Sequence, residues 1–266
     1  MQNEIKVALL ISTYNWPQAL ELVLISVLSQ THFPNEIVIA DDGSTPATKA
    51  LIDTYREKFD IPLKHVWHED LGFRKTVILN KALNECEADY VVQVDGDIVL
   101  HTKFIEDHLQ AAQQGFFVQA SRAMINPFQS AQMIKEKKVD INFMSPGIFN
   151  RFNALRIPGL AFLFAFERRK YRVKGCNLAF WKKDFEAVNG YFNGFKGWGA
   201  EDYEFGARLL HAGVKKKRIK LMAIGYHIYH EVNSRANTAV NDRIFNDTIV
   251  QKHVYTPNGY REVIST

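Results

Sequence analysis

Cysteine is scarce in this chain. Cys86 and Cys176 are the only two cysteines among 266 residues, and neither belongs to a CxxC pair. A disulfide framework and a paired-cysteine metal or redox site are therefore excluded, and a reducing compartment fits best. Long apolar runs are absent too, since no segment reaches the roughly 18 consecutive apolar residues that a membrane-spanning helix requires. The apolar run near the N-terminus is broken by Ser12, Thr13 and Asn15, which indicates a buried strand rather than a signal peptide.

A strong charge imbalance is also missing. The 33 lysines and arginines against 29 aspartates and glutamates leave a net charge of +4, spread along the chain. Charge therefore does not suggest nucleic-acid binding, and we expect no nucleic-acid partner. Hydrophobic residues make up 47% and charged residues 23%, as in ordinary folded proteins. We expect one large domain or two small ones, in a cytoplasmic protein that is soluble or peripheral at a membrane.

Strand and helix patterns alternate through the first hundred residues. Short apolar runs followed by turn residues predict strands, and apolar residues at helical spacing predict helices between them. The predicted strands cover residues 7–11, 36–40, 63–67 and 90–94, and the predicted helices cover residues 19–28, 48–59 and 76–86. This alternation predicts an α/β fold with a mostly parallel sheet and helices on both faces. Polar clusters at residues 12–15, 41–44 and 95–97 follow three of these strands and should meet in one crevice.

The turn Asp95-Gly96-Asp97 places two carboxylates after an apolar strand. Hard divalent cations prefer oxygen ligands, and such a turn leaves positions open for phosphate oxygens. An Asx turn that caps a helix is the alternative, but the position at a strand end favours a metal site. His227 and His230 form an HxxH pair, and we expect His230 to supply the further ligand that such a site needs, although a lone histidine is more often structural.

Two more turns carry charge. Asp42 lies in a DDGS turn whose default interpretation is a plain turn; the alternative is a carboxylate that binds a nucleobase or ribose beside the ring of Tyr14. Arg74 and Lys75 open a helix, where cations oppose the helix dipole. A diphosphate bound by Arg74 would compensate them, and a solvated basic turn is the alternative.

Residues 197–202, Gly-Trp-Gly-Ala-Glu-Asp, form the most distinctive stretch. Two glycines around Trp198 give an open backbone beside a flat aromatic surface, and the carboxylates of Glu201 and Asp202 follow at a predicted helix start. Carboxylates at a helix N-terminus also serve as simple caps, and Trp198 could equally belong to the core.

The order of STYN, DDGS, GFRKTVILNKAL, VDGD, KGCNLAF, GYFNGFKGWGAED and YHIYH resembles family 2 glycosyltransferases of the nucleotide-diphospho-sugar transferase (GT-A) fold. The carboxy-terminal part is similar to an acceptor-side segment shared by animal β-galactosyltransferases and bacterial chondroitin-type polymerases. The likeness runs from about Ile5 to about Arg235. It implies a mostly parallel central sheet flanked by helices, with a helical acceptor-side insertion and a C-terminal tail. It also implies a nucleotide-sugar-binding half at residues 1–125, an acceptor-binding and catalytic half at residues 126–235, and a helical tail at residues 236–266.

The resemblance also implies roles for individual residues. Asp202 becomes the general base, and Glu201 orients the acceptor. Asp95 and Asp97 hold ribose and a Mn²⁺ or Mg²⁺ ion, and His230 completes the metal shell. The residues expected to contact the donor are Thr13, Tyr14, Asn15, Asp42, Arg74, Asn80, Asp95, Gly96 and Trp198. Ala200 departs from the pattern, because many relatives have glycine there.

These roles imply an inverting, metal-dependent glycosyltransferase. The donor is a UDP-sugar carrying a hexose or N-acetylhexosamine, and the acceptor is a saccharide or a lipid-linked saccharide of bacterial lipopolysaccharide, capsule or another surface glycan. A sugar nucleotidyltransferase is an alternative, but such an enzyme requires a glycine-rich, lysine-containing loop after the first strand. This chain has the sequence STYNWP there. A glycoside hydrolase would not need the Asp-Gly-Asp turn. A non-catalytic carbohydrate-binding protein is the third alternative, against which the presence of both Asp97 and Asp202 argues.

One apolar run lies between clusters of cations. Residues 157–166 are bracketed by Arg151 and Arg156 on one side and by Arg168, Arg169, Lys170 and Arg172 on the other. The run is too short to span a bilayer. It forms either a buried hairpin or helix of the acceptor half, or a segment that dips into an anionic headgroup region while the cations pair with phosphates.

Overall fold

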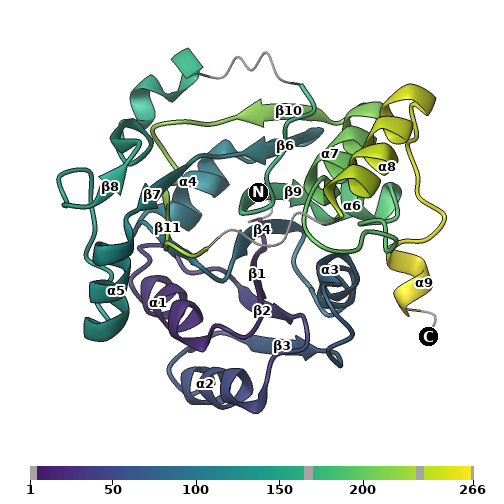
Figure 1. Ribbon diagram of the computed structural model, residues 1–266. Helices are drawn as coiled ribbons and strands as arrows, with labels where there is room; N and C mark the ends of the chain where they lie inside the picture. The colour runs from purple at the N-terminus through teal and green to yellow at the C-terminus, as the bar shows by residue number, and fades with distance from the viewer. Residues whose placement is uncertain (1–4, 165–169, 232–236, 265–266) are drawn as a thin grey trace.

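Seven strands form the central sheet of the computed structural model, which describes residues 5–164, 170–231 and 237–264. The strand order is β10-β6-β9-β4-β1-β2-β3, and only β9 runs antiparallel to its neighbours (Figure 1). The mostly parallel sheet predicted from the sequence is therefore confirmed. The strands are β1 (Val7–Thr13), β2 (Glu36–Asp41), β3 (Leu63–Trp67), β4 (Tyr90–Asp95), β6 (Phe116–Gln119), β9 (Asn177–Trp181) and β10 (Lys215–Arg218).

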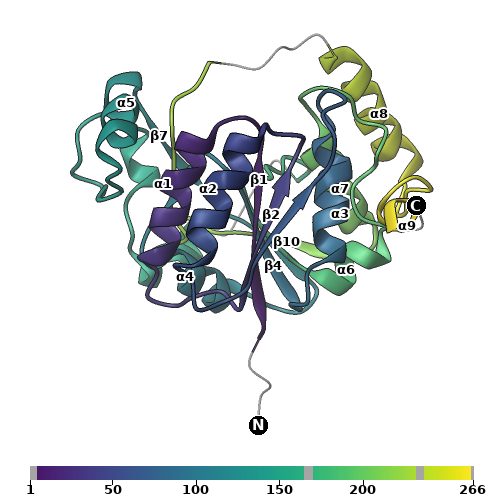
Figure 2. The same ribbon diagram turned by 90° about the horizontal axis from the view of Figure 1, so that it is seen from below.

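Helices cover both faces of this sheet, as predicted (Figure 2). On one face lie α1 (Pro17–Leu28), α2 (Pro46–Arg56) and α4 (Phe104–Ala111); on the other lie α3 (Lys75–Asn84), α6 (Lys182–Ala187) and α7 (Glu201–His211). Leu9 packs into the first layer and Leu10 into the second. Successive side chains of a strand point to opposite faces, so a strand buried on both faces must be apolar throughout.

The predicted element boundaries hold to within a few residues. The strand at residues 63–67 is observed as predicted, whereas the helix predicted at residues 48–59 begins earlier, at Pro46, and ends at Arg56. Proline is well suited to the first helical position, because that residue's N–H has no partner within the helix.

A second, smaller sheet lies beside the first, at the left of Figure 1. Its strands follow the order β5-β11-β7-β8, and the pairing of β5 with β11 is antiparallel. Its strands are β5 (Ile98–Leu100), β7 (Arg122–Ile125), β8 (Ile148–Phe149) and β11 (Gly225–His227). Along the chain, α5 (Pro127–Glu136) and the 3-10 helix η1 (Arg151–Asn153) come between β7 and the apolar run at residues 157–166. The sequence patterns did not reveal this sheet.

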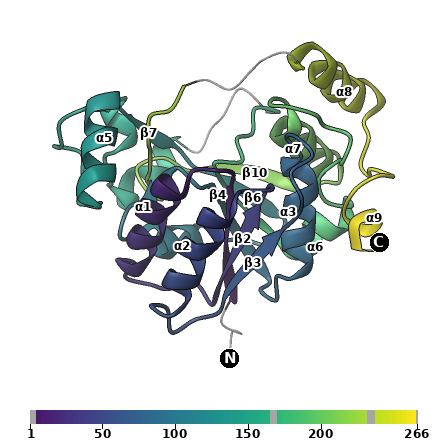
Figure 3. The same cartoon turned by 60° about the horizontal axis from the view of Figure 1, so that its bottom comes forward.

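The C-terminal tail is helical, as predicted. Helix α8 (Thr238–Gln251) packs against α7, and α9 (Tyr260–Ile264) packs against α3. Figure 3 shows α8 standing across the molecule from α5. The hydroxyl of Thr248 donates to Glu204 at 3.2 Å, and Glu204 also pairs with the fully buried Arg208 at 2.6 Å. A buried charge is tolerated only when it is paired, so these contacts fix α8 to α7.

The apolar run at residues 157–166 contains a 3-10 helix, η2 (Pro158–Phe164), with exposed side chains at Leu160, Leu163 and Phe164. The prediction of a buried hairpin or helix is wrong for these residues. Residues 165–169, which include Arg168 and Arg169, lie outside the described residues. No helix in the ranges that the structure describes is long and apolar enough to cross a bilayer.

Arg156 also differs from expectation. Its guanidinium forms two hydrogen bonds to Asp107, at 2.6 and 3.0 Å, and Asp107 has no exposed surface. The hypothesis that Arg156 pairs with lipid phosphate is therefore wrong, because an ion pair inside the protein already occupies this side chain.

Candidate functional site

The carboxyl ends of β1, β2 and β4 bring the predicted polar clusters together. Thr13 lies opposite Asp41, and Ser12 lies opposite Asp95, in the parallel register of the three strands. Parallel strands end at one edge of a sheet, so the convergence expected from the sequence is confirmed.

The Asp95-Gly96-Asp97 turn is held against β1. The Gly96 N–H donates to the Ser12 carbonyl at 2.7 Å, and the Ser12 hydroxyl donates to Asp95 Oδ1 at 3.0 Å. A Cβ atom at Gly96 would lie 3.0 Å from that carbonyl oxygen, so a larger residue would push the turn away from β1 by a few tenths of an ångström. The chain then enters β5, which pairs with β11 so that Ile98 lies opposite His227.

This pairing brings the HxxH segment to Asp97. The Asp97 Oδ2 atom lies 3.4 Å from His227 Nε2 and 3.2 Å from His230 Nε2. The ligand atoms of the three residues all lie within 4.8 Å of one another. Asp97 Oδ1 is buried without a hydrogen-bond partner. Burial lowers the pKa of His227, which favours the neutral imidazole that binds metals.

The group formed by Asp97, His227 and His230 fits a divalent cation, because one carboxylate and two imidazoles suit a first-row metal and a cation would satisfy the unpartnered oxygen. From the sequence only His230 of this pair is expected to bind the metal, so His227 is an additional ligand. The HxxH spacing was its only signal in the sequence. Asp95 lies outside this group.

Asp95 is instead paired with Lys75, whose Nζ lies 2.6 Å from Asp95 Oδ1. Burial opposes the charge of this lysine, but Asp95, Asp202 and Glu201 together raise the pKa of Lys75 well above its usual range. Burial acts against the charge of Asp95 as well, yet the neighbouring Lys75 keeps the pKa of Asp95 below its usual value. Both groups are therefore charged. Lys75 neutralises part of the negative charge of Asp95, Glu201 and Asp202, which form the acidic edge of the sheet.

Arg74 lies at the start of α3, beside Asp42. Its backbone N–H donates to Asp42 Oδ2 at 2.9 Å, and its guanidinium donates to the Glu69 carbonyl at 2.5 Å. The charge of Lys75 is thus paired with Asp95, whereas the guanidinium of Arg74 contacts a neutral carbonyl, and its buried Nε has no hydrogen-bond partner. The interpretation of a solvated basic turn does not hold for Lys75, which is largely buried.

The residues expected to hold a nucleobase lie beside this helix start. Tyr14 is about half exposed, 52%, and its hydroxyl donates to Asp70 at 2.9 Å. Asn15 joins two loops: its N–H donates to the Ser44 hydroxyl, and its side chain accepts from the Thr45 N–H, both at 2.8 Å. An exposed aromatic face on a hydrogen-bonded loop is suited to stacking against a flat ring.

Asn80 does not line this surface. It is fully buried, and its amide donates to the Tyr191 carbonyl and to Asn193 Oδ1, both at 2.8 Å, while accepting from the Tyr191 N–H at 2.9 Å. The expectation that Asn80 contacts the donor does not fit this geometry. Asn80 instead fixes the chain at residues 191–193, a few residues before Glu201 and Asp202, which together form the acidic pair.

A strained loop presents the acidic pair. Gly197, Gly199 and Ala200 all have positive φ, at 68°, 120° and 67°. Ala200 therefore adopts, at a cost of about 1–2 kcal/mol, a conformation that glycine would adopt freely. The Gly199 N–H donates to Glu201 Oε2 at 2.9 Å. No side chain caps α7 at Ala200, but Glu201 and Asp202 lie in the first turn of α7, where carboxylates favour a helix N-terminus as the capping interpretation expects.

Asp202 is anchored through one oxygen only. The Gly175 N–H donates to Asp202 Oδ2 at 2.7 Å, whereas Oδ1 is buried without a hydrogen-bond partner. A Cβ atom at Gly175 would lie 2.3 Å from Asp202 Oδ1, which explains the glycine of the KGC motif. This arrangement leaves one oxygen able to accept a proton.

Helix α8 braces the same loop. The buried Asn241 donates to the Lys196 carbonyl at 3.1 Å and also reaches the carbonyls of Gly197 and Trp198, both at 3.5 Å. Trp198 is 42% exposed, so it is not a core residue. The role of Asn241 could not be read from the sequence, because it lies more than forty residues from the loop.

Comparison with protein families matches this architecture to a known group. Residues 8–172 match the family described as glycosyl transferase family 2, and residues 162–231 match the N-terminal domain of galactosyltransferase. The chain belongs to glycosyl transferase family 2.

Several proteins are similar to this family 2 chain. A hyaluronan synthase of Pasteurella multocida is 24% identical over 84% of the chain, which spans 24% of that protein. A validoxylamine A glucosyltransferase of Streptomyces hygroscopicus subsp. limoneus is 27% identical over 92% of the chain, which spans 56% of that protein. The chain thus spans a quarter to little more than half of these relatives.

Solved structures show the same GT-A fold at low identity. S. aureus TarS 1-349 in complex with UDP-GlcNAc aligns with a TM-score of 0.64 and 17% identity, over 97% of this chain and 69% of that one. The mannosyltransferase PcManGT of Pyrobaculum calidifontis, in complex with GDP-Man and Mn²⁺, aligns with a TM-score of 0.60 and 18% identity, over 100% of this chain and 66% of that one.

The acidic pair of this family 2 chain holds protons more tightly than free carboxyl groups do. Burial, with the charge of Asp202 beside it, raises the pKa of Glu201 to about 7. Burial also raises the pKa of Asp202, although the ammonium of Lys75 opposes this. A carboxylate with a raised pKa is a stronger base, which suits proton abstraction near neutral pH.

We predict that Glu201→Gln stabilises the protein increasingly as the pH rises. The folded state of the wild type binds more protons than the unfolded state between about pH 4.5 and about pH 7, so its stability falls through that window. Glutamine carries no charge to bury. The free energy of unfolding of the variant relative to wild type should increase by about 2–3 kcal/mol between pH 5 and pH 8, as measured by urea denaturation.

Glu57→Gln, at an exposed position after α2, is the matched control and should show no such pH dependence. If the free energies of unfolding of Glu201→Gln and wild type differed by the same amount at every pH, folding would not raise the pKa of Glu201, and the prediction would be wrong.

Proposed function

We propose that this chain transfers a hexose or N-acetylhexosamine from a UDP-sugar to a hydroxyl of a saccharide acceptor, with inversion at the anomeric carbon. The observation that carries the proposal is the buried Oδ1 of Asp202, which has no hydrogen-bond partner, together with the group Asp97, His227 and His230. The complexes of TarS with UDP-GlcNAc and with UDP support a UDP-sugar donor. The names of the relatives support surface-polysaccharide synthesis as the setting, in lipopolysaccharide, capsule or another bacterial glycan.

The donor is bound by residues 1–125 in this proposal. Tyr14 stacks on the uracil ring, and Asp42, which His68 and the Arg74 backbone hold in place, accepts hydrogen bonds from it. Asp95 contacts the ribose. A Mn²⁺ or Mg²⁺ ion bound by Asp97, His227 and His230 would neutralise the charge that develops on the departing diphosphate.

The acceptor and the chemistry belong to residues 126–235, and the tail at residues 236–266 braces them. Trp198 borders the two sugars, and Glu201 orients the acceptor. Asp202 Oδ1 takes the proton from the acceptor hydroxyl while the Gly175 N–H holds Oδ2. The acceptor oxygen then forms a bond to the anomeric carbon on the face opposite the UDP oxygen, whose bond breaks, so an α-linked donor gives a β-linked product.

We predict that Asp202→Asn abolishes most turnover. Asparagine keeps the shape and the hydrogen bond from Gly175 but cannot accept the hydroxyl proton, so kcat should fall by about 10²–10⁴-fold. The Kd for the UDP-sugar should stay within about twofold, since Asp202 acts on the acceptor. UDP release with an acceptor panel, together with calorimetric donor binding, measures both.

Asp242→Asn, on the exposed side of α8, controls for loss of a carboxylate and should keep wild-type turnover. A kcat for Asp202→Asn close to that of wild type would move the base to another residue.

Metal binding gives a second prediction. His227→Ala and His230→Ala should each weaken Mn²⁺ binding by at least about tenfold in a titration followed by electron paramagnetic resonance, because each removes one of three ligands. EDTA should abolish transfer and added Mn²⁺ should restore it. His32→Ala, at an exposed histidine, should bind Mn²⁺ like wild type. Full transfer activity in EDTA is incompatible with a metal role.

The exposed apolar side chains support peripheral association with the inner face of the cytoplasmic membrane. Leu163 on η2, Phe149 and Phe152 are 59–80% exposed, and Arg151 lies beside the two phenylalanines. Lys170 follows η2 and is exposed as well. Apolar side chains bordered by cations are suited to an anionic interface, where each cation contributes about 1 kcal/mol.

We predict that the protein co-sediments with liposomes containing anionic lipid at low salt and is released at high salt. Leu163→Ser combined with Phe152→Ser should reduce binding severalfold. Val250→Ser, at an exposed apolar position on α8, should not reduce it. Binding that ignores both lipid charge and salt would exclude this surface as the docking site.

A further inference from the structure

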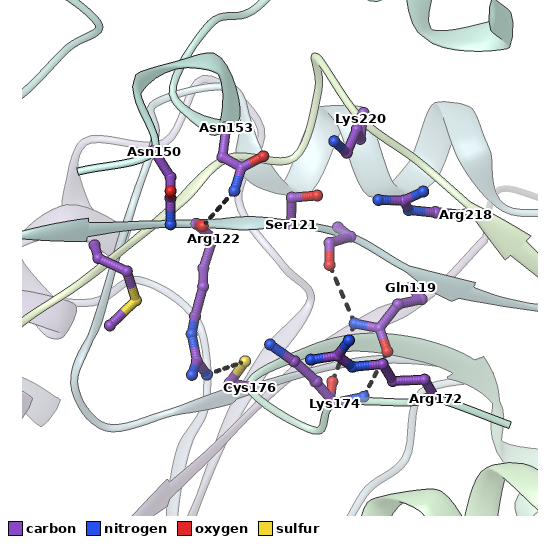
Figure 4. Close-up of a pocket in the computed structure, with 12 residues that line it drawn as sticks. Gln119, Ser121, Arg122, Asn150, Asn153, Arg172, Lys174, Cys176, Arg218 and Lys220 are labelled. Atoms are coloured by element: carbon purple, nitrogen blue, oxygen red, sulfur yellow. Dashed lines mark hydrogen bonds between the residues drawn. The ribbon is translucent and has the colours of Figure 1, made fainter. Parts of the chain in front are cut away.

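A cationic cavity of about 440 Å³ is lined by Lys174 and Cys176, the two neighbours of the Gly175 that holds Asp202 (Figure 4). Five of its lining residues carry a positive charge, and among the twelve described lining residues there is no aspartate or glutamate. In Figure 4, Arg218 and Lys220 lie on one side of Gln119, and Arg172 and Lys174 lie on the other. The fifth cation is Arg122.

Most of these charges have no carboxylate partner. Within the described parts of the chain, Arg122, Arg172, Lys174 and Lys220 form no ion pair. Arg122 donates to the Cys176 thiol at 2.7 Å, and the Lys220 ammonium lies 5.8 Å from the centre of the Phe164 ring. Burial, together with the charges of Arg122 and Arg172, lowers the pKa of Lys174. Arg122 and Arg172 therefore repel the ammonium of Lys174, and a bound anion would relieve this repulsion.

The cavity borders the catalytic edge without overlapping the proposed donor site. Cys176, which lines the cavity, follows Gly175, the residue that holds Asp202. Neither Tyr14 nor Asp42 nor Asp95 lines it. A molecule anchored in the cavity can therefore extend a hydroxyl toward Asp202 while the donor occupies the other side.

We propose that this cavity binds a phosphate group of the acceptor, so that the acceptor is a phosphorylated saccharide, either soluble or lipid-linked. The inference rests on the proposed function, whose acceptor class it names. A phosphate fits better than a single carboxylate because it carries up to two charges and three oxygens, which match the several cations and the guanidinium fork of Arg122. Asn150 and Ser121 add polar side chains to the lining.

Calorimetric binding in EDTA and at low salt tests the cavity without catalysis or metal. Glucose 1-phosphate and inorganic phosphate should bind wild type, and methyl glucoside should not. Lys174→Gln and Lys220→Gln should each weaken phosphate binding by at least about tenfold. Lys183→Gln, at an exposed lysine on α6 outside this cavity, should leave it unchanged.

Absence of phosphate binding in wild type, equal binding by the two cavity variants, or preferential binding of glucuronate would each overturn the inference. Transfer assays with glucose 1-phosphate and with a prenyl-diphosphate-linked sugar then identify the source of the phosphate. If phosphate binds as expected but UDP-sugar and Mn²⁺ do not bind, the proposed function fails and the site stands. If transfer to neutral saccharides proceeds and phosphate does not bind, the proposed function stands and the inference fails.

Discussion

The ammonium of Lys75 is the charge on which the acidic edge of the sheet depends. Without it, the carboxylates of Asp95, Glu201 and Asp202 would meet in a largely buried volume with only mutual repulsion between them. Its ion pair with Asp95 keeps the pKa of Asp95 below its usual value, whereas burial raises the pKa values of Glu201 and Asp202 although Lys75 opposes this rise. Asp95 thus stays ionised beside the donor position, whereas Glu201 and Asp202 on the acceptor side bind protons more readily than free carboxyl groups do.

The small second sheet brings the residues of the metal group together. Asp97 leaves the main sheet at the end of β4, and the antiparallel pairing of β5 with β11 returns His227 to it from more than a hundred residues away. The Ile228 N–H donates to the Asp97 carbonyl at 2.9 Å, which fixes the start of the segment that carries His230. The site therefore belongs to both sheets rather than to one loop.

Sequence patterns predicted the strands and helices of the first hundred residues, because short continuous apolar runs and helical spacing reflect burial directly. They did not predict β5 or β11, since strands of three residues are too short to show a period. Arg74 and Lys75 look equivalent in sequence, but neighbours at a helix start point about 100° apart, and only the tertiary structure decides which one faces Asp95. Asn80 and Arg156 likewise gained their partners, Tyr191 and Asp107, from packing between distant segments.

Helix α8 is synthesised after the loop and the helix that it holds in place, so the site cannot be complete before α8 is made. All five site carboxylates lie before residue 203, yet the loop that presents Asp202 is held by Asn241, and α7 is held by Thr248. A nascent chain that has emerged only as far as α7 carries these carboxylates, but it lacks His227, His230 and the contacts of α8 with the loop and with α7. Since contacts between distant segments form late in folding, the ribosome releases a competent site only after α8 has emerged and docked.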